Sequence, residues 1–387
     1  MAPRIPFNKP FIAGKELYYI AQAVANGSIA ADGHFTKQCS RLFEAEFDIA
    51  KVLMTPSCTA ALEIAAMLCD LDVDDEVILP SYTFVSTANA IVRLKAKPVF
   101  VDIRPDTLNI NEELIEDAIT PRTKAIFPVH YAGVSCEMDR IMQIAARHDL
   151  FVVEDAAQGV YASYHGRPLG SIGHFAAYSF HETKNYICGE GGALCINAPQ
   201  CIERAEIIRE KGTNRSRFLR GMVDKYTWVD VGSSYVPNEL SCAFLYAQLE
   251  LLDSIADRRR NIYDFYHHHL APLEERGLLQ LPTIPEGCGS NYHMFFVLLP
   301  DTDKRDALIT SLKDQGILAP FHYVPLHTSP VGSRFGYRVG DLPVTENLSG
   351  RLVRLPFYYE ISEVEQIEVV SRIADFTATM FGRRAAA

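Results

Sequence analysis

The chain has 387 residues, of which 48% are hydrophobic and 22% are charged, and its formal net charge is −11 at pH 7. This composition is typical of a globular protein with a sizeable core, and the length predicts two packed lobes. The acidic balance, with no block of lysine or arginine, argues against nucleic acid or an anionic membrane as a partner. No stretch approaches the roughly 18 consecutive apolar residues of a transmembrane helix, so we expect none.

Compartment and metal content can also be judged from the sequence. The N-terminal stretch MAPRIPFNKPF lacks the apolar core of a secretory signal. The nine cysteines are scattered and no pair has CxxC spacing, which favours free thiols in a reducing cytoplasm over a disulfide framework. The run HHH at 267–269 would point to different sides of a helix, so we assign no metal.

The first 250 residues alternate between short β-branched runs and segments with helical periodicity. The pattern predicts strands at 51–55, 76–80, 98–103, 125–130, 150–155, 175–180 and 192–197. It predicts helices at 59–71 and 137–148, and a turn leading into a helix over 81–94. Alternation of this kind, with fully apolar strands, indicates an α/β fold with a mostly parallel sheet covered by helices on both faces.

The pattern changes after about residue 250. A long amphipathic helix is expected over 251–277, followed by a strand-like run at 292–300 and helices at 304–316 and 362–381. We therefore predict a large α/β domain over residues 1–250 and a smaller C-terminal α+β domain over residues 251–387.

Polar residues follow several of the predicted strands, at the end where open α/β sheets bind ligands. In TPSCTAAL (55–62) the backbone N–H groups of Cys58 and Thr59 would begin a helix and favour an anion such as phosphate. A plain helix cap explains the same residues equally well. Phe84, just past another strand, could lie flat against an aromatic ring or belong to the core.

Two further stretches carry charged groups to the same end of the sheet. VVEDAAQG (152–159) ends an apolar strand in Asp155, which needs a cation or hydrogen-bond donors. A protonated heterocyclic nitrogen would supply one, although a helix cap or a salt bridge is the alternative. SFHETKNY (179–186) places Lys184 in a short loop between an apolar strand and the glycine turn GEGGA. A phosphate cradle, a flat aromatic, an aspartate and a lysine together predict pyridoxal 5′-phosphate (PLP) bound covalently to Lys184.

The motifs VEDAAQ, SFHETKN and GEGGA, in that order, resemble the DegT/DnrJ/EryC1/StrS family of sugar aminotransferases. The similarity extends from IPFNKPF near the start to RLVRLPFYYEIS near the end. The resemblance implies a fold-type-I PLP-dependent enzyme that works as a homodimer with shared active sites, its cofactor passing through pyridoxamine 5′-phosphate during turnover.

The resemblance also implies roles for individual residues. The catalytic residue would be Lys184, and the cofactor would be held by Cys58, Thr59 and Ser179 at the phosphate, Phe84 on the ring, Asp155 at the pyridine nitrogen and Gln158 at the ring hydroxyl. Many members have the sequence GYN where this chain has GSS at 232–234, and their Asn reaches the phosphate of the neighbouring subunit. Ser234 takes that place here with a shorter side chain.

The substrates implied by the resemblance are L-glutamate and dTDP-4-dehydro-6-deoxyglucose. Amination at C4 would give dTDP-4-amino-4,6-dideoxygalactose for surface polysaccharides of the enterobacterial common antigen type. The resemblance assigns His181 to the substrate. His322 and His327 either line the sugar-nucleotide pocket or are structural, and Lys211 and Arg215 either meet the diphosphate or are solvated.

Two other functions are compatible with parts of this pattern. A related branch dehydrates deoxysugars at C3 and carries histidine in place of the anchoring lysine, so Lys184 argues against it. A PLP-binding regulatory protein without turnover is the other alternative, but the chain offers no helix-turn-helix and no basic face.

Overall fold

A seven-stranded sheet organises the first part of the chain in the computed structural model, which describes residues 3–27 and 29–382. Its strand order is β1-β9-β8-β5-β4-β2-β3. The strands are β1 (Lys51–Thr55), β2 (Glu76–Pro80), β3 (Lys97–Val101), β4 (Thr123–Ile126), β5 (Phe151–Asp155), β8 (Phe175–Ser179) and β9 (Gly192–Ile196). All are parallel except β9, which runs antiparallel to both β1 and β8.

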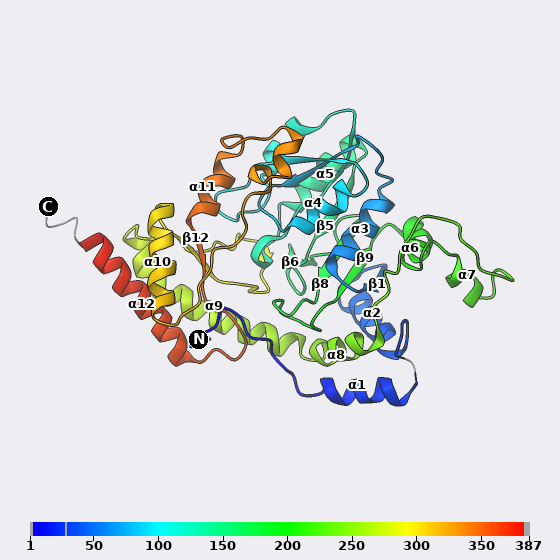
Figure 1. The fold of residues 1–387 in the computed structure, drawn as a ribbon, viewed down its shortest axis with the longest axis horizontal. Coiled ribbons are helices and arrows are strands. Elements are labelled where there is room, and N and C mark those ends of the chain that lie inside the picture. Colours follow the sequence, from blue (N-terminus) through cyan, green and yellow to red (C-terminus); the bar gives the residue numbers. More distant parts are fainter. Residues whose placement is uncertain (1–2, 28, 383–387) are drawn as a thin grey trace.

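Helices cover both faces of this sheet (Figure 1). On one face α3 (Cys58–Leu68), α4 (Val85–Val92) and α6 (Ile202–Arg209) pack near side chains such as Val153 and Phe175. On the other face α2 (His34–Glu46), α5 (Met138–His148) and α8 (Glu239–Leu249) cover the alternate side chains, among them Val152 and Ala176. Because successive strand residues face opposite sides, apolar residues at both kinds of position require this double cover. The predicted α/β class with a mostly parallel sheet is confirmed.

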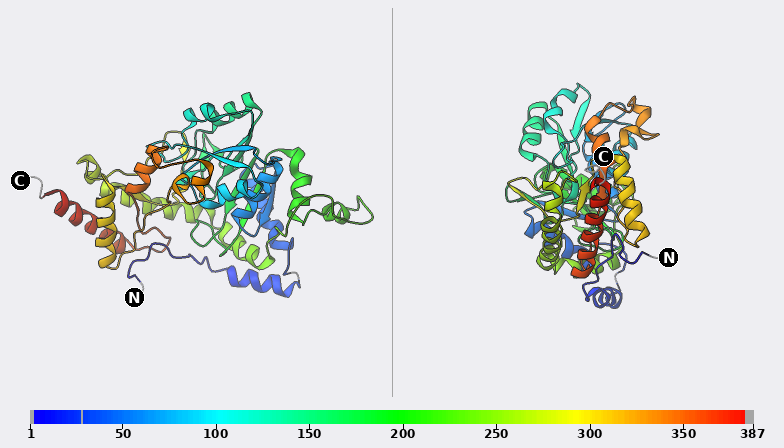
Figure 2. Two further views of the ribbon diagram at one scale, coloured as in Figure 1. Left: turned by 45° about the horizontal axis from the view of Figure 1, so that its top comes forward. Right: turned by 90° about the vertical axis from the view of Figure 1, so that its left-hand side faces the viewer.

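The C-terminal part of the chain has its own small core. It contains α9 (Leu252–Glu275), β11 (Phe296–Leu298), α10 (Thr302–Asp314), α11 (Pro343–Arg351), β12 (Leu352–Arg354) and α12 (Glu363–Gly382). Strands β11 and β12 form an antiparallel pair, and α10 and α12 gather with α9 at one end of the molecule (Figure 2). The N-terminal segment also reaches this core, since Ile5 pairs with Ile317. The domain boundary near residue 250 stays a prediction.

The remaining elements are peripheral to the large sheet. Helix α1 (Glu16–Ala25) lies along α8, and α7 (Arg215–Leu219) belongs to an arm that projects from the body (Figure 1). Short strands β6 (Ser163–Tyr164), β7 (Arg167–Pro168) and β10 (Cys288–Gly289) form a third sheet. Across the described ranges, no helix has both the length and the apolar character that crossing a bilayer requires.

The carboxyl ends of β1, β2, β5 and β8 meet at one edge of the large sheet, because these strands are parallel. The antiparallel strand β9 begins at the same edge with Gly192, which pairs with both Thr55 and Ser179. A Cβ added at Gly192 would lie 2.4 Å from the backbone nitrogen of Cys58. Only glycine therefore lets β9 pass this close to the first turn of α3.

We expect the substitution Gly192→Ala to lower the free energy of unfolding by about 1–3 kcal/mol, because backbone atoms of α3 have to move aside. Urea denaturation of the purified protein measures this effect. The same displacement widens the first turn of α3, so affinity for added PLP should fall as well. An unchanged unfolding midpoint would show that the contact is relieved without cost.

Candidate active site

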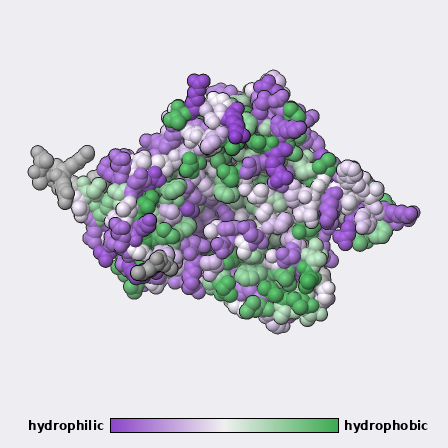
Figure 3. Space-filling view, viewed as in Figure 1, coloured by the Kyte–Doolittle hydropathy of each residue, from purple (hydrophilic) through white to green (hydrophobic). Residues whose placement is uncertain are grey.

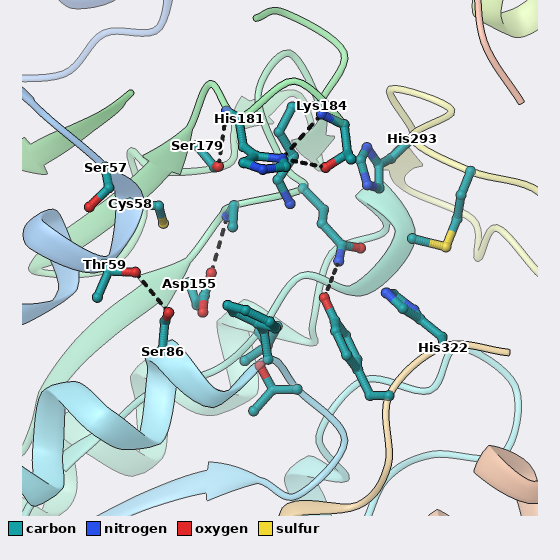
Figure 4. A pocket seen from close by; sticks show the side chains of 18 of the residues that line it. Ser57, Cys58, Thr59, Ser86, Asp155, Ser179, His181, Lys184, His293 and His322 are labelled. Atoms are coloured by element: carbon teal, nitrogen blue, oxygen red, sulfur yellow. Dashed lines mark hydrogen bonds between the residues drawn. The ribbon is translucent and has the colours of Figure 1, made fainter. Parts of the chain in front are cut away.

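A cavity of about 520 Å³ opens at the carboxyl edge of the large sheet and is lined by both ends of the chain. Figure 4 shows groups from α3 and α4 on one side and His293 and His322 on the other. The lining includes nine of the residues singled out in the sequence: Cys58, Thr59, Phe84, Asp155, Gln158, Ser179, His181, Lys184 and His322. These side chains come from four strand ends and one C-terminal loop, so the predicted convergence at the sheet edge is found.

Lys184 follows β8 and turns into the cavity. Its backbone N–H donates to the carbonyl of His181 at 2.9 Å, which holds the loop in a tight turn. In the described part of the chain, its amine has neither a hydrogen bond nor an ion pair. Burial lowers the pKa of Lys184 and the nearby charge of Arg354 lowers it further, while Cys58 and Asp155 act in the opposite direction. The amine is thus more easily deprotonated than that of an ordinary surface lysine.

Asp155 ends β5 and is only 5% exposed. The hydroxyl of Thr87 donates to its Oδ2 at 2.6 Å, and the backbone N–H of Ala157 donates to its Oδ1 at 3.1 Å. Burial raises the pKa of this carboxyl, whereas the two donors and the charge of Lys184 lower it. A cationic group bound in the cavity would offset the remaining free-energy cost of burying this carboxylate.

The first turn of α3 forms an anion site in the cavity wall. Ser57 caps the helix, its Oγ accepting from the N–H of Ala60 at 3.1 Å. The N–H groups of Cys58 and Thr59 lie in the first turn of α3, where they have no acceptor within the helix, and they can donate to a ligand. The hydroxyls of Thr59 and Ser86 lie 2.7 Å apart beside them, and burial raises the pKa of the Cys58 thiol, so it stays neutral. This arrangement of donors suits a phosphate group.

Gln158 is fixed between two partners. Its Oε1 accepts from the N–H of Ala132 at 2.7 Å, and its Nε2 donates to the hydroxyl of Tyr323 at 3.0 Å. Ala132 has a left-handed backbone, with φ +57°, which turns its N–H toward the amide. Phe84 is 56% exposed and forms part of the cavity wall. It is therefore available to a flat ring and does not belong to the core.

Two predicted histidines face the cavity with defined hydrogen bonds. Nδ1 of His181 accepts from the N–H of Thr183 at 3.2 Å. Nδ1 of His322 lies 2.7 Å from the hydroxyl of Tyr131, and its ring stacks on Tyr323 with 3.6 Å between centroids. Burial lowers the pKa of His322 well below its usual range, which keeps this ring neutral.

Four other candidates do not line the cavity. His327 is fully buried between the hydroxyl of Ser81 and the carboxylate of Glu346, at 2.7 and 2.9 Å, which is a structural position. Lys211 and Arg215 both pair with Glu210, at 3.3 and 3.2 Å, and neither lines the cavity. Ser234 is exposed and forms an isolated bridge with Glu210.

Sequence reasoning missed several groups in or beside the cavity: Ser86, Thr87, His293, Tyr323 and Arg354. Ser86 and Thr87 lie in the segment PSYTFVSTANA (80–90), where a helix start after a strand end could have indicated them. The other three come from the C-terminal lobe, where no strand-end rule applies. His293 donates from Nδ1 to Asn185, the residue after Lys184, at 2.9 Å, and so ties that loop to the C-terminal lobe.

These groups fit PLP on their own chemistry. The donors at the first turn of α3 would suit a phosphate, the carboxylate of Asp155 would pair with a protonated ring nitrogen, and Lys184 places an amine in the same cavity. The fold and this site define a fold-type-I PLP-dependent aminotransferase. The chain belongs to the DegT/DnrJ/EryC1/StrS aminotransferase family, whose sequence profile matches residues 10–374.

Known proteins of the same kind are similar over nearly the whole chain. The spore coat polysaccharide biosynthesis protein SpsC of Bacillus subtilis is 34% identical over 96% of this chain and 96% of its own length. DesV of S. venezuelae, solved in complex with a ketimine intermediate, is 30% identical with a TM-score of 0.87 over 97% of this chain and 99% of its own. The putative sugar aminotransferase Spr1654 of Streptococcus pneumoniae, solved in its PMP form, is 25% identical with a TM-score of 0.90 over 97% and 100%. The protein is accordingly a PLP-dependent sugar aminotransferase.

The substitution Asp155→Asn tests the charge that faces the ring nitrogen. We expect turnover to fall by roughly 1,000-fold or more, because the neutral amide cannot keep that nitrogen protonated. The cofactor-free variant should unfold at a higher temperature than the cofactor-free wild type at pH 7, because a buried carboxylate with a raised pKa is removed. Steady-state kinetics and thermal unfolding measure the two effects. Near-normal turnover would mean that Asp155 serves only to hold Thr87 and Ala157.

Proposed function

We propose that the protein transfers the amino group of L-glutamate to the C4 ketone of dTDP-4-dehydro-6-deoxyglucose. The product is dTDP-4-amino-4,6-dideoxygalactose, a building block for surface polysaccharides of the enterobacterial common antigen type, made in the cytoplasm. The observation that carries the amino transfer is the unpaired amine of Lys184 in one cavity with Asp155 and the anion site of α3. The proposed sugar specificity rests on motifs such as TPSCTAALE and LPSYTFVSTANA, which resemble those of family members that aminate this sugar. The name of SpsC, a polysaccharide biosynthesis protein, is in keeping with this proposal.

Lys184 has two tasks in this reaction. It anchors the cofactor, and its neutral amine takes the proton from the α-carbon of the amino donor. PLP, when bound, supplies a ring that withdraws electrons from that carbon. The lowered pKa of Lys184 suits the second task, because a permanently charged ammonium could not accept a proton.

The surrounding residues orient the reacting groups. The carboxylate of Asp155 would stabilise a positive charge on the ring nitrogen, while the N–H groups of Cys58 and Thr59 and the hydroxyl of Ser179 would hold the phosphate. Phe84 would stack on the ring, and Gln158 would reach its hydroxyl. His181 and His322 line the same cavity and would bind oxygens of the sugar.

Product analysis by NMR tests the proposed reaction. Wild-type protein incubated with L-glutamate and dTDP-4-dehydro-6-deoxyglucose should give 2-oxoglutarate and an axial amine at C4 of the sugar. Lys184→Ala should give no product above background, and it should not retain PLP after borohydride reduction and denaturation. Loss of the C3 oxygen without amine formation would instead identify a dehydratase. A bound cofactor with no half-reaction on glutamate would favour the regulatory alternative.

The working unit is proposed to be a homodimer. Apolar side chains remain exposed along the projecting arm, namely Phe218, Leu219, Met222, Tyr226, Trp228, Val229 and Val231. Figure 3 shows a second apolar surface over α1, where Leu17 is 79% exposed. The arm leads directly into the exposed loop that carries Ser234. A second copy of the chain that covers the arm would therefore contact this loop as well. Ser234 would then reach the phosphate site of the neighbouring chain.

Complementation between two inactive variants tests the shared site. One chain carries Lys184→Ala and the other carries Ser234→Trp. The large tryptophan side chain should keep the loop out of the neighbouring active site without contacting the cavity of its own chain. Refolded together in equal amounts, they should recover about a quarter of wild-type activity, because half of the dimers have one intact site. Each variant refolded alone is the control. An active monomer in sedimentation, or no recovery in proven mixed dimers, contradicts the shared site.

A further inference from the structure

We propose that Asn185 and His293 form a clamp that sets the direction of the Lys184 side chain. Asn185 directly follows Lys184 in the sequence, whereas His293 belongs to the C-terminal part of the chain and lines the cavity (Figure 4). The inference rests on the proposed amino transfer, because that reaction needs the amine of Lys184 at one defined place. It adds to the reaction two positioning residues that act through the lysine.

The amine of Lys184 has no bond of its own that could direct it. In residues 3–27 and 29–382, this amine has neither a hydrogen-bond partner nor an ion pair, and the backbone N–H of Lys184 donates to the carbonyl of His181 at 2.9 Å. A lysine carries its amine on a flexible stem, so the amine can reach many positions unless its backbone is fixed. The direction of the side chain therefore depends on how the loop at residues 184 and 185 is held.

The side chain of Asn185 is bound on both sides of its amide. It is only 7% exposed, its Nδ2 donates to the carbonyl of Asn291 at 2.8 Å, and its Oδ1 lies 2.9 Å from Nδ1 of His293. An amide oxygen can only accept, so Nδ1 of His293 is the donor. Two hydrogen bonds to residues that are two positions apart fix the plane of the amide, and with it the backbone next to Lys184.

The C-terminal side of the clamp is itself held in place. Arg259 of α9 donates from Nε to the carbonyl of Tyr292 at 3.0 Å and from Nη2 to the carbonyl of His293 at 2.5 Å. Nδ2 of Asn291 donates to the carbonyl of Gln158 at 2.8 Å. Tyr292 has a left-handed backbone, with φ +52°, a conformation that persists only where the surrounding structure enforces it. The clamp thus rests on a fixed support.

The hydrogen bond to Asn185 also defines the state of the His293 ring. Burial and then the nearby charge of Lys184 lower the pKa of His293 well below its usual range, so the ring is neutral and its one proton is on Nδ1. Lys184 becomes positively charged when it takes the proton from the amino donor. A neutral ring in the same cavity does not oppose this step, whereas an imidazolium would.

A purely structural role is the alternative for such a buried amide. Gln366 of α12 provides an example, because it is 3% exposed and its Nε2 donates to the carbonyl of Ile262 at 3.1 Å, outside the cavity. Asn185 differs from Gln366 in being next to the reacting lysine and in having a partner that lines the cavity. A structural role predicts a loss of stability alone, whereas a positioning role predicts slower reactions at the amine of Lys184.

The experiment compares wild type with Asn185→Ala, His293→Phe, the double variant and the control Gln366→Ala. The first readout needs no amino donor. PLP is added to the cofactor-free proteins, and the absorbance change that accompanies its covalent attachment to Lys184 is followed over time. The second readout is the half-reaction of the PLP-loaded proteins with L-glutamate and with L-glutamate deuterated at the α-carbon. Thermal unfolding measures the stability of each protein.

We expect Asn185→Ala and His293→Phe each to slow PLP attachment and the glutamate half-reaction by roughly 10- to 100-fold, because the amine of Lys184 is displaced from its target. The deuterium isotope effect should exceed that of wild type, because proton transfer then limits the half-reaction more strongly. The double variant should be no slower than the slower single variant, because both residues act through one amide. Gln366→Ala should lose stability and keep wild-type rates and isotope effect.

Two outcomes overturn the inference. One is that both single variants match Gln366→Ala in rates and isotope effect, which would leave the clamp a purely structural role. The other is a double variant whose loss of rate equals the product of the two single losses, which would mean that His293 does not act through Asn185.

The test also holds if one variant or the proposed function fails. If Asn185→Ala does not fold, His293→Phe decides the first outcome alone, since it keeps the hydrogen bond between Asn185 and Asn291. Wild-type protein that attaches PLP but does not react with L-glutamate would refute the proposed function. The rates of PLP attachment would still decide whether the clamp directs Lys184.

Discussion

The buried carboxyl of Asp155 and the half-buried amine of Lys184 lie at one edge of a parallel sheet, and the rest of the site depends on this constraint. Neither ion is satisfied by a salt bridge with the other. Asp155 instead receives hydrogen bonds from Thr87 and Ala157, while the amine of Lys184 has no hydrogen-bond partner among residues 3–27 and 29–382. The sheet can place both groups there because β5 and β8 are adjacent and parallel, so their carboxyl ends lie side by side. Both groups can therefore pair with a ligand that carries the complementary charges.

The pKa shifts of Asp155 and Lys184 indicate how their burial affects the stability of the cofactor-free protein. Burial raises the pKa of Asp155, so folding is favoured at low pH and this contribution is lost as the pH rises through the raised value. Burial lowers the pKa of Lys184, so its contribution is present at high pH and is lost as the pH falls through the lowered value. Burial thus disfavours the charged form of each group, and each charged form opposes folding. Functional sites commonly hold such destabilising groups, and a bound ligand that pairs with them stabilises the fold by mass action.

The cavity residues at the sheet edge could be predicted from the sequence, whereas those from the C-terminal part of the chain could be predicted only in part, since His322 was a candidate and Arg354 and His293 were not. Cys58, Asp155 and Lys184 each follow a strand, and parallel strands bring such positions to one edge whatever the details of packing. Arg354 and His293 belong to the C-terminal lobe, whose position against the sheet is set by tertiary contacts. His327 was a candidate because it flanks a Pro-containing loop together with His322, but the turn between them directs it to Ser81 in the core. Local sequence pattern contains no information about that direction.

The same division explains how the cavity can serve different reactions within one fold. The sheet edge supplies the groups that hold the cofactor, and these are tied to strand geometry and to Gly192. The opposite wall comes from the C-terminal part of the chain and from the N-terminal segment, and consists of Phe7, Asn8, His293, Met294, His322, Tyr323, Arg354 and Phe357. Tyr323 joins the two walls through Gln158, and His293 joins them through Asn185. A substitution on the C-terminal wall can therefore alter substrate binding without changing a strand end, whereas a substitution at the sheet edge alters the cofactor site first.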